Sequence, residues 1–308
     1  MIFYKGDIPS LSHPTCVTAG IFDGIHVGHQ YLIKELVRSA NKKGCDSLIL
    51  TFYPHPGSIA LNETTQYIIS EREQERIFEE LGVKILVRAD FYKLYRMSSG
   101  EYIEFLVDRL KMQEIFVGHD HSFGRNREGN AEVLKKLSKE KSFSCLFIPD
   151  VSFGGKKISS SRIKESLSQG EVETASYFLG RPYSVSGIVT RSVGRGEKLG
   201  FPTANVLWDK DLFCPKNGVY FVSLKIDRGI FYGMANIGKR PTFDGNDTFL
   251  EVHIFDFDGY LYNKEITVFF HFWIRNEMKF NSNDELILQL KKDKEKCKTL
   301  FTLLKQAG

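Results

Sequence analysis

The hydrophobic pattern of the chain changes once, near residue 180, and this change constrains the fold more than any other feature. Before it, short apolar runs alternate with amphipathic segments of helical period. The runs at 15–22, 47–52, 84–89, 114–118 and 143–148 are predicted as strands, and the segments at 30–40, 70–81, 98–110 and 131–139 as helices, with a capping box of Ser70 and Glu73 opening the second. This alternation predicts a parallel sheet with helices on both faces.

Beyond the sequence GRPY at residues 180–183, the apolar segments shorten and are separated by Gly, Pro, Asn and Asp. Strands are predicted at 183–190, 218–226, 230–236, 248–254 and 265–273, followed by a closing helix at 284–304 whose charged run, KKDKEKCK, is predicted to be a solvated face. Closely spaced strands of this kind predict an antiparallel barrel. A length of 308 residues fits two domains, which we place at 1–182 and 183–308.

Composition excludes several classes of protein. A formal charge of +4 is too weak to indicate a nucleic-acid partner. The cysteines are odd in number, widely spaced and without a C-x-x-C pair, which predicts reduced thiols: Cys16, Cys45, Cys145, Cys214 and Cys297. The N-terminus does not resemble a signal peptide, and no apolar run reaches the roughly 18 residues of a membrane helix. We therefore expect a soluble, cytoplasmic protein without a membrane partner.

The segment GIFDGIHVGH, residues 20–29, joins the first predicted strand to the first predicted helix. A ligand there would lie beyond the carboxyl end of a parallel strand, where open α/β sheets bind ligands. The glycines allow the backbone to approach a phosphate, and the helix N-terminus attracts it. His26 and His29 would then stabilise negative charge in a transition state. The alternatives are that these histidines cap a helix or bind a metal.

A serine cluster at residues 158–163, ISSSRI, opens a further predicted helix. Its hydroxyl groups, its free backbone N–H groups and the cation of Arg162 can together hold a polyphosphate. The alternative is an ordinary serine N-cap beside a surface arginine.

The segment GRGEKLGFPTAN, residues 194–205, combines a glycine-rich loop with a short polar motif. Backbone N–H groups and two cations can surround phosphates there, although the loop lacks the ending of a Walker motif and a flexible β-turn is the alternative. Pro202 restricts the backbone, while Thr203 and Asn205 stand two apart on a strand and can point the same way. Their oxygens suit a magnesium ion shared with ATP phosphates.

Glu251 belongs to the segment LEVHIFDFDG, residues 250–259. Its neighbours Leu250 and Val252 should face the opposite side of a strand. A carboxylate pointing into a barrel mouth is a candidate general base for a substrate hydroxyl, and an exposed strand carboxylate is the alternative. The later residues of this segment predict a hairpin turn rather than a metal site.

These segments resemble bacterial bifunctional riboflavin kinase/FAD synthetases. Residues 20–29 resemble their G-x-F-D-G-x-H-x-G-H signature, found in the H-x-G-H nucleotidyltransferase superfamily. Residues 51–56, 117–124 and 158–163 resemble their T-F-x-P-H-P, V-G-x-D-F-x-F-G and I-S-S-T-x-I segments. Residues 194–205, 236–243, 250–259 and 274–280 resemble their riboflavin kinase domain. The resemblance covers nearly the whole chain, in the order of the family.

The resemblance implies a Rossmann-like α/β FMN adenylyltransferase domain followed by a six-stranded antiparallel β-barrel riboflavin kinase domain with a C-terminal helix. The implied reactions are phosphorylation of riboflavin by ATP to FMN, then adenylylation of FMN by ATP to FAD. They imply ATP as co-substrate, Mg²⁺ as cofactor, FMN and FAD as products, and riboflavin, FMN and ATP as small-molecule partners, with no nucleic acid and no membrane.

The resemblance also distributes roles among residues. It makes Glu251, His26 and His29 catalytic, and Thr203 and Asn205 ligands of the metal. Phe123 and Arg275 are implied to bind flavin. The residues implied to bind nucleotide are Gly20, Phe22, Asp23, Gly28, Asp120, Ser159, Ser160, Ser161, Arg162, Gly194, Arg195, Gly196, Lys198, Gly200 and Pro202.

Three positions depart from the family pattern. Ile21 stands where a small polar residue is usual, Tyr53 replaces Glu, and His121 replaces Phe. These departures leave open a working kinase joined to an impaired adenylyltransferase. Two further alternatives are an H-x-G-H transferase acting on another phosphate ester or a pantetheine compound, and a flavin-binding regulatory protein without turnover. The sequence makes no prediction of oligomeric state.

Overall fold

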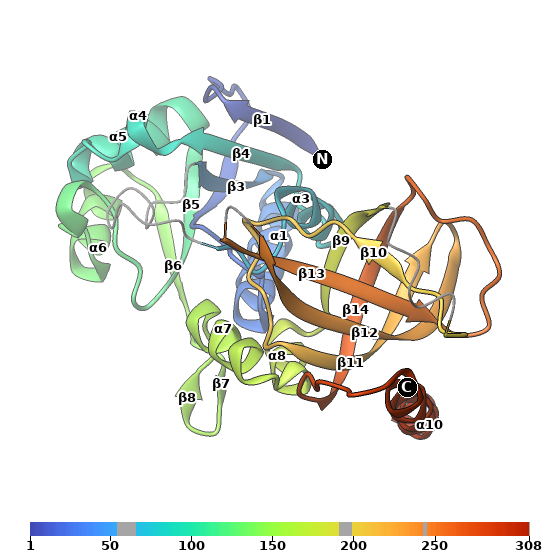
Figure 1. The fold of residues 1–308 in the computed structure, drawn as a ribbon. Coiled ribbons are helices and arrows are strands. Elements are labelled where there is room, and N and C mark those ends of the chain that lie inside the picture. The colour runs from blue at the N-terminus through green and yellow to red at the C-terminus, as the bar shows by residue number, and fades with distance from the viewer. Residues whose placement is uncertain (54–65, 191–198, 243–244, 308) are drawn as a thin grey trace. The chain divides into compact units, whose positions relative to one another are not determined.

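The structure is a computed structural model that describes residues 1–53, 66–190, 199–242 and 245–307. The chain forms two compact units, Met1–Ser160 and Ser161–Gly308 (Figure 1). No helix among the described segments is long and apolar enough to cross a bilayer.

The first unit contains a six-stranded sheet in which every pair of neighbouring strands is parallel. Across the sheet the strands are β1 (Ile2–Gly6), β4 (Ile85–Asp90), β3 (Asp46–Tyr53), β2 (Thr15–Ala19), β5 (Met112–Gly118) and β6 (Ser144–Ile148). From β2 the chain first builds toward β3 and β4, and later resumes on the other side with β5 and β6. The space beyond the carboxyl ends of β2 and β5 is therefore a topological switch point, where such sheets bind ligands.

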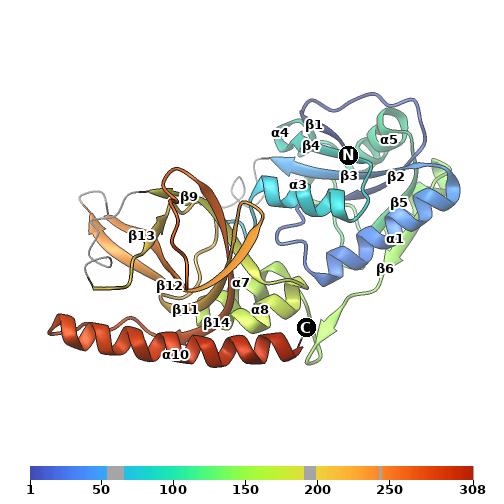
Figure 2. The same cartoon turned by 90° about the vertical axis from the view of Figure 1, so that its right-hand side faces the viewer.

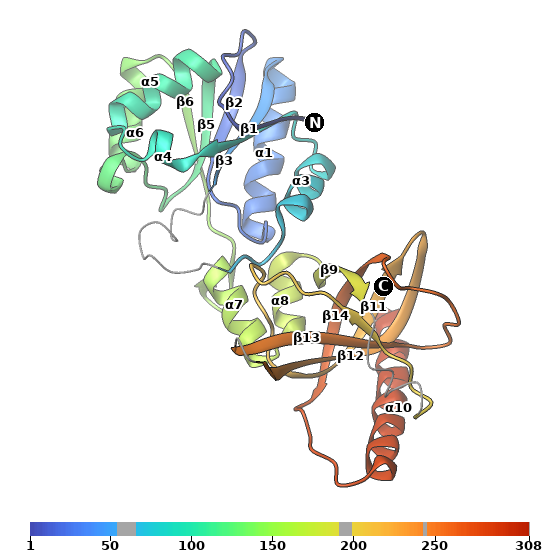
Figure 3. The ribbon, with the colours of Figure 1, turned by 45° about the horizontal axis from the view of Figure 1, so that its top comes forward.

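Helices cover both faces of this sheet, as predicted (Figure 3). The helical elements are α1 (Val27–Lys43), α3 (Glu71–Glu80), α4 (Phe91–Leu94), α5 (Ser99–Leu110), the short helix η1 (Arg125–Arg127) and α6 (Ala131–Glu140), and a small hairpin of β7 (Ser152–Phe153) and β8 (Lys156–Lys157) follows β6. The α5 side chains Ile103 and Leu106 form one core cluster with Leu48 and Val87 of the sheet. Helix α1 packs on the opposite face.

Two details of the first unit differ from the sequence prediction. Strand β1 was not expected, because it is a largely exposed edge strand without an alternating apolar face. At α3, the Ser70 hydroxyl accepts a hydrogen bond from Glu73 N at 3.2 Å, while the Glu73 carboxylate pairs with Arg76 at 2.6 Å. A complete capping box is found instead at α5, between Ser98 and Glu101.

The second unit contains a closed six-stranded barrel in which all neighbouring strands are antiparallel, as predicted. Around the barrel the strands are β10 (Ala204–Val206), β13 (Gly245–Ile254), β12 (Gly229–Thr242), β11 (Gly218–Ile226), β14 (Glu265–Arg275) and β9 (Tyr183–Thr190). Helices α7 (Ser160–Gln169) and α8 (Val172–Leu179) precede it. The final helix, α10 (Asn283–Ala307), lies along the outside of the barrel (Figure 2).

The outer wall of the barrel beneath α10 is apolar. Cys297 of α10 is fully buried and forms a cluster with Phe221 and Ile274 of the strands. The charged run 291–298 is therefore solvated on only part of its surface, because Cys297 and Asp293 both face the barrel and are buried. The prediction of a fully solvated face was wrong at these two positions.

Candidate active sites

A pocket of about 300 Å³ opens at the carboxyl ends of β2, β5 and β6 in the first unit. We call it the switch-point pocket. It brings together many residues that the sequence predicted as a nucleotide site: Gly20, Phe22, His26, Gly28, His29, Asp120, Ser159 and Ser160. Residues from 20–29, 117–121 and 158–160, which are far apart in the sequence, thus line one pocket at this edge of the sheet.

The two histidines of the first motif are stacked at the N-terminus of α1. His26 is the N-cap residue, and its Nδ1 accepts a hydrogen bond from His29 N at 3.3 Å. Their ring centroids are 3.7 Å apart and the rings are inclined by only 17°. A Cβ atom at Gly28 would lie 3.2 Å from the His26 ring, so glycine leaves room for this arrangement. His26 therefore caps the helix and also lines the pocket.

Both imidazoles are neutral near pH 7. Burial lowers the pKa of His26 from 6.5 to about 4, and the nearby charge of Lys157 acts in the same direction. Burial also lowers the pKa of His29 far below its usual value, with smaller contributions from His26 and Lys157. The buried His29 Nδ1 has no hydrogen-bond partner among the described residues. These rings can stabilise a phosphate as neutral hydrogen-bond donors rather than as cations.

Lys157 supplies a positive charge in the switch-point pocket and was missed by sequence reasoning. Its Nζ lies 2.7 Å from the Asp120 carboxylate and 2.8 Å from that of Asp150. The hydrogen bond from Lys157 is the main cause that lowers the pKa of Asp120. The doublet Lys156-Lys157, directly before the serine cluster, was the available signal in the sequence.

Other predicted residues of this site have structural contacts. Asp23 is buried, its Oδ1 accepts a hydrogen bond from Ile68 N at 2.7 Å, and its carbonyl accepts one from Ser160 Oγ at 2.8 Å. Phe123 belongs to the core cluster beneath α5. Ser161 and Arg162 belong to the second unit, where the Arg162 guanidinium lies 4.7 Å from the Phe178 ring centroid.

The three departures from the family pattern have different surroundings. Ile21 and His121 line the switch-point pocket, and burial lowers the pKa of His121 to about 4. The His121 ring stacks on Phe123 with 5.9 Å between centroids. Tyr53 is exposed at the end of β3 under the ammonium group of Lys5. Residues 54–56 of the same predicted motif lie outside the described residues.

Two neighbouring cavities lie in the second unit. The first, of about 290 Å³, is bounded by the barrel, the segment after β14 and the start of α10, and its walls are mainly apolar. It contains three predicted residues: Thr203, Glu251 and Arg275. The second, of about 310 Å³, is lined by Pro202, Thr203 and the aromatic residues Phe257, Tyr260 and Tyr262. We call them the apolar cavity and the aromatic cavity. Thr203 lines both.

Glu251 faces away from the barrel core. Leu250 and Val252 are fully buried, and Glu251 lies between them on the other face of β13, in the apolar cavity with Leu286 and Leu290 of α10. The predicted alternation is confirmed. The expected position in the barrel mouth was wrong, because α10 packs on the outer wall and creates the cavity there.

The strand register places Glu251 in a polar row. Asn205 of β10 and Asn236 of β12 are its cross-strand partners on either side. Asn236 also lines the apolar cavity, and its buried Oδ1 has no hydrogen-bond partner among the described residues. Sequence reasoning did not select Asn236, because only the pairing of β12 with β13 brings it beside Glu251.

Arg275 is held by a buried carboxylate of α10. Its Nη2 lies 2.8 Å and its Nε 3.0 Å from Asp293 Oδ2, and Asp293 is only 2 % exposed. This pair fixes an arginine at the wall of the apolar cavity. The sequence indicated Arg275 but not its partner, which stands within the charged run of α10.

The glycine-rich loop is only partly described. Gly194, Arg195, Gly196 and Lys198 lie outside the described residues. Gly200 has φ +78°, a conformation that favours glycine. The Pro202 carbonyl is hydrogen-bonded to His253 Nδ1 at 2.9 Å, which ties the end of the loop to β13.

The donors in the second unit suit magnesium rather than a softer metal. Among the described residues there is no group of three or more His, Cys, Asp or Glu side chains that could hold a metal ion. Magnesium is usually bound by few protein oxygens together with substrate phosphates. The Thr203 hydroxyl, at the wall shared by both cavities, and the Asn205 amide oxygen are such donors.

Comparison with known proteins gives one consistent result. A family described as FAD synthetase matches residues 8–162, and one described as riboflavin kinase matches residues 179–301. The bifunctional riboflavin kinase/FMN adenylyltransferase of Listeria monocytogenes is 33% identical over 92% of each chain, and that of Escherichia coli K12 is 34% identical over 95% of each chain. A Streptococcus pneumoniae crystal structure titled macrolide-efflux protein is 33% identical, covers 96% of this chain and 98% of its own, and has a TM-score of 0.87.

Proposed function

The chain belongs to the family of bifunctional riboflavin kinases/FMN adenylyltransferases, and from this premise we propose which residues perform its two reactions. It transfers a phosphoryl group from ATP to riboflavin, giving FMN and ADP. It then joins FMN to the AMP part of a second ATP, giving FAD and pyrophosphate. The observation that carries the assignment of residues is that one chain contains both a histidine-lined switch-point pocket and a carboxylate-bearing cavity beside a Thr/Asn pair.

For the kinase reaction, we place riboflavin in the apolar cavity and ATP in the aromatic cavity. Phe201, Phe280 and the leucines of α10 provide flat apolar surface for a flavin ring, and the aromatic residues of the other cavity suit adenine. Glu251 accepts the proton of the terminal ribityl hydroxyl as this oxygen attacks the γ-phosphorus. Arg275, held by Asp293, orients the flavin.

Thr203 and Asn205 are the residues that would hold Mg²⁺. When bound, the ion neutralises negative charge on the ATP phosphates, which lowers the barrier to phosphoryl transfer. Because Thr203 lines both cavities, its hydroxyl stands where the two substrates approach each other. The family resemblance assigns phosphate binding to Gly194, Arg195, Gly196 and Lys198, which lie outside the described residues, and to Gly200.

For the adenylyl transfer, an oxygen of the FMN phosphate attacks the α-phosphorus of ATP, and pyrophosphate leaves. No covalent enzyme intermediate is required, because the FMN phosphate is itself the nucleophile. The neutral rings of His26 and His29 donate N–H groups to the phosphate oxygens on which charge increases. Lys157, Ser159 and Ser160 of the switch-point pocket hold the triphosphate. Phe123 remains our proposed flavin contact.

We propose the boundary 182/183 for the two domains and a cytoplasmic location. This boundary assigns α7 and α8 to the adenylyltransferase domain, although the two helices belong to the second compact unit. The five cysteines are all free thiols, as is usual in a reducing compartment.

The decisive experiment is product chromatography after the pure protein is incubated with riboflavin, ATP and Mg²⁺. We expect FMN to appear first and FAD to follow, and both to disappear when EDTA removes the metal. FMN that accumulates without FAD would instead identify an impaired adenylyltransferase. Flavin that stays bound and unchanged would contradict both reactions.

A further inference from the structure

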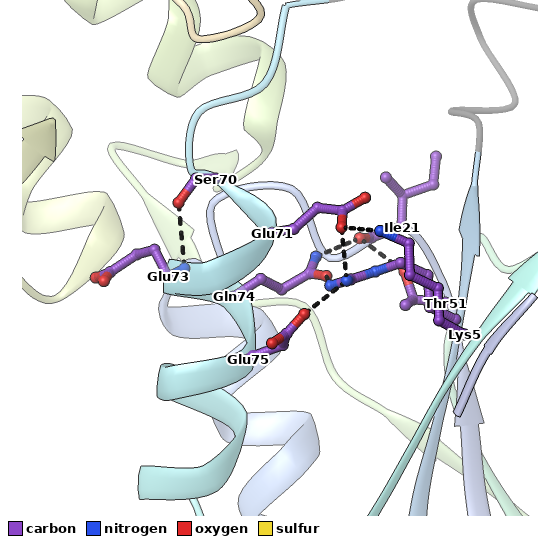
Figure 4. A network of polar contacts seen from close by, with 9 residues as sticks. Lys5, Ile21, Thr51, Ser70, Glu71, Glu73, Gln74 and Glu75 are labelled. Carbon is purple, nitrogen blue, oxygen red and sulfur yellow. Dashed lines mark hydrogen bonds and ion pairs between the residues drawn. The ribbon is translucent and has the colours of Figure 1, made fainter. Parts of the chain in front are cut away.

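We call residues 20–26, between β2 and α1, the signature loop. A polar network in the first unit reaches this loop from α3, outside the switch-point pocket (Figure 4). The Gln74 side chain points from α3 toward this loop, and its Nε2 donates to the Ile21 carbonyl at 3.0 Å. The same amide lies 3.4 Å from the Phe22 carbonyl, and Thr51 Oγ1 of β3 donates to the Ile21 carbonyl at 3.3 Å. Two side chains from different elements thus hold the backbone between β2 and His26.

The orientation of the Gln74 amide is set by a buried arginine. Arg88 of β4 donates from Nη2 to Gln74 Oε1 at 3.0 Å, so the amide nitrogen must face the loop. The Arg88 side chain is only 2% exposed and is neutralised by Glu75 at 2.7 Å and Glu71 at 3.0 Å. A buried cation held by two carboxylates has little freedom to move.

The loop that Gln74 holds has a backbone conformation that side chains rarely adopt. Phe22 has φ +54° and Ile25 has φ +41°. Such conformations are costly for residues other than glycine and persist only where the surroundings enforce them. Hydrogen bonds to the carbonyls of Ile21 and Phe22 enforce this conformation directly.

Phe22, whose carbonyl accepts a hydrogen bond from Gln74, contacts His29. Its ring meets the His29 ring edge to face, with 5.2 Å between centroids, and packs on Phe78 at 5.8 Å. A Cβ atom at Gly20 would lie 3.3 Å from the Phe22 ring, so the ring is confined on that side as well. The position of the His29 ring therefore depends on the conformation that Gln74 imposes.

We propose that Gln74 is a positioning residue of the adenylyl-transfer reaction, acting through the signature loop on the placement of His29. This inference rests on the role proposed above for His29. It also explains how Ile21 can replace a small polar residue, because the contacts with Gln74 and Thr51 use the backbone carbonyl and not the side chain.

The test compares both activities in the same full-length protein, so the kinase serves as an internal reference. Gln74→Met keeps the length of the side chain and removes its hydrogen bonds. We expect the kcat of FAD formation from supplied FMN to fall about tenfold, with little change in KM for ATP, because small misplacements of catalytic groups reduce turnover. FMN formation from riboflavin should be unchanged.

Two further variants keep the test decisive if Gln74→Met folds poorly. Gln74→Glu keeps an acceptor for Arg88 but turns a carboxylate oxygen toward the carbonyls of Ile21 and Phe22. It should lower adenylyl transfer at least as much as Gln74→Met does. Thr51→Val removes only the longer of the two hydrogen bonds to the Ile21 carbonyl and should lower adenylyl transfer about twofold. The matched control on α3 is Arg76→Gln, because Arg76 forms ion pairs with Glu73 and Glu80 of the same helix and is 49% exposed; both activities should persist.

An unchanged kcat of adenylyl transfer in Gln74→Met, or an equal loss of both activities, would overturn the proposal. His29→Ala separates this failure from failure of the proposed function. If His29→Ala lowers FAD formation and Gln74→Met does not, only the positioning role is wrong. If neither variant lowers it, the assignment of the histidines is wrong as well.

Discussion

The two halves of the molecule build phosphate-handling sites in opposite ways. In the first unit, the backbone builds the site: three loops leave the carboxyl ends of parallel strands at a switch point, and a helix N-terminus faces the pocket. In the second unit, the strand register builds it: Glu251 lies between Asn205 and Asn236 on paired strands, and α10 closes the cavity. The first kind of site is concentrated in a continuous motif, whereas the second depends on residues that only sheet pairing brings together.

The comparison teaches that the two sites use different charge states. The switch-point pocket holds histidines that burial keeps neutral, beside the ammonium group of Lys157 and the carboxylates of Asp120 and Asp150 that pair with it. The apolar cavity holds the carboxylate of Glu251 and the guanidinium of Arg275. Stabilising a leaving pyrophosphate requires donors, and activating a hydroxyl requires a proton acceptor. Four measurements test whether the two sites differ in this way.

The largest effect is expected from Glu251→Gln. Loss of a general base should lower kinase turnover by about 10²-fold or more, while adenylylation of supplied FMN persists. The assay measures FMN from riboflavin and FAD from FMN separately. Glu265→Gln, at an exposed strand carboxylate, is the matched control. Normal kinase turnover in Glu251→Gln would refute the role of the carboxylate as base.

His29→Ala should give the reverse pattern. Removing one donor to the developing charge is expected to lower FAD formation by about 10²-fold and to spare FMN formation. The exposed His13 provides a control substitution, His13→Ala. Equal loss of both activities would show that the two reactions do not use separate sites.

Asp293→Asn tests whether the apolar cavity depends on α10. The change leaves Arg275 without its buried carboxylate, so we expect the second unit to lose about 3 kcal/mol of stability and the KM for riboflavin to rise. Urea unfolding followed by tryptophan fluorescence reports this unit, because both tryptophans, Trp208 and Trp273, belong to it. Glu295→Gln, in an exposed pair of the same helix, should change stability by less than about 0.5 kcal/mol. An equal effect of both variants would contradict the structural role of Asp293.

The smallest effect concerns acid stability. Burial lowers the pKa of His26 and His121 from 6.5 to about 4, so below pH 6.5 the unfolded chain binds more protons than the folded chain. The stability linked to these neutral histidines is complete above pH 6.5 and is lost as the pH falls toward 4. His121→Phe should therefore move the acid transition of the first unit down by about 0.5 pH unit.

Far-UV circular dichroism follows the acid transition of the whole chain, and tryptophan fluorescence follows the second unit alone. The second unit also contains a partly buried histidine, His271, whose pKa desolvation lowers to about 4, so this unit is expected to weaken in the same pH range. The His121→Phe shift should appear only in the circular dichroism signal. A shift in both signals would contradict the assignment to the first unit.

Much of the fold was predictable because its signals are local. The alternation of apolar runs with helical segments predicted the parallel sheet, and the closely spaced strands predicted the barrel. The edge strand β1 was not predicted, because a strand that pairs on one side and is largely exposed has no apolar periodicity. The prediction of a solvated face for residues 291–298 was wrong at Asp293 and Cys297, because packing on the barrel buries these two side chains within a locally polar run.

The two fold classes, the family and the positions of the histidine motif and of Glu251 could be predicted from the sequence, because periodicity and contiguous motifs are properties of the chain read in order. The three-dimensional fold was needed to show that Lys157 lines the switch-point pocket, that Asn236 lies beside Glu251, that Glu251 faces α10, and that Gln74 holds the signature loop. These arrangements arise from strand register and helix packing, which join residues far apart in the sequence; apart from the Lys156-Lys157 doublet, no single segment indicates them.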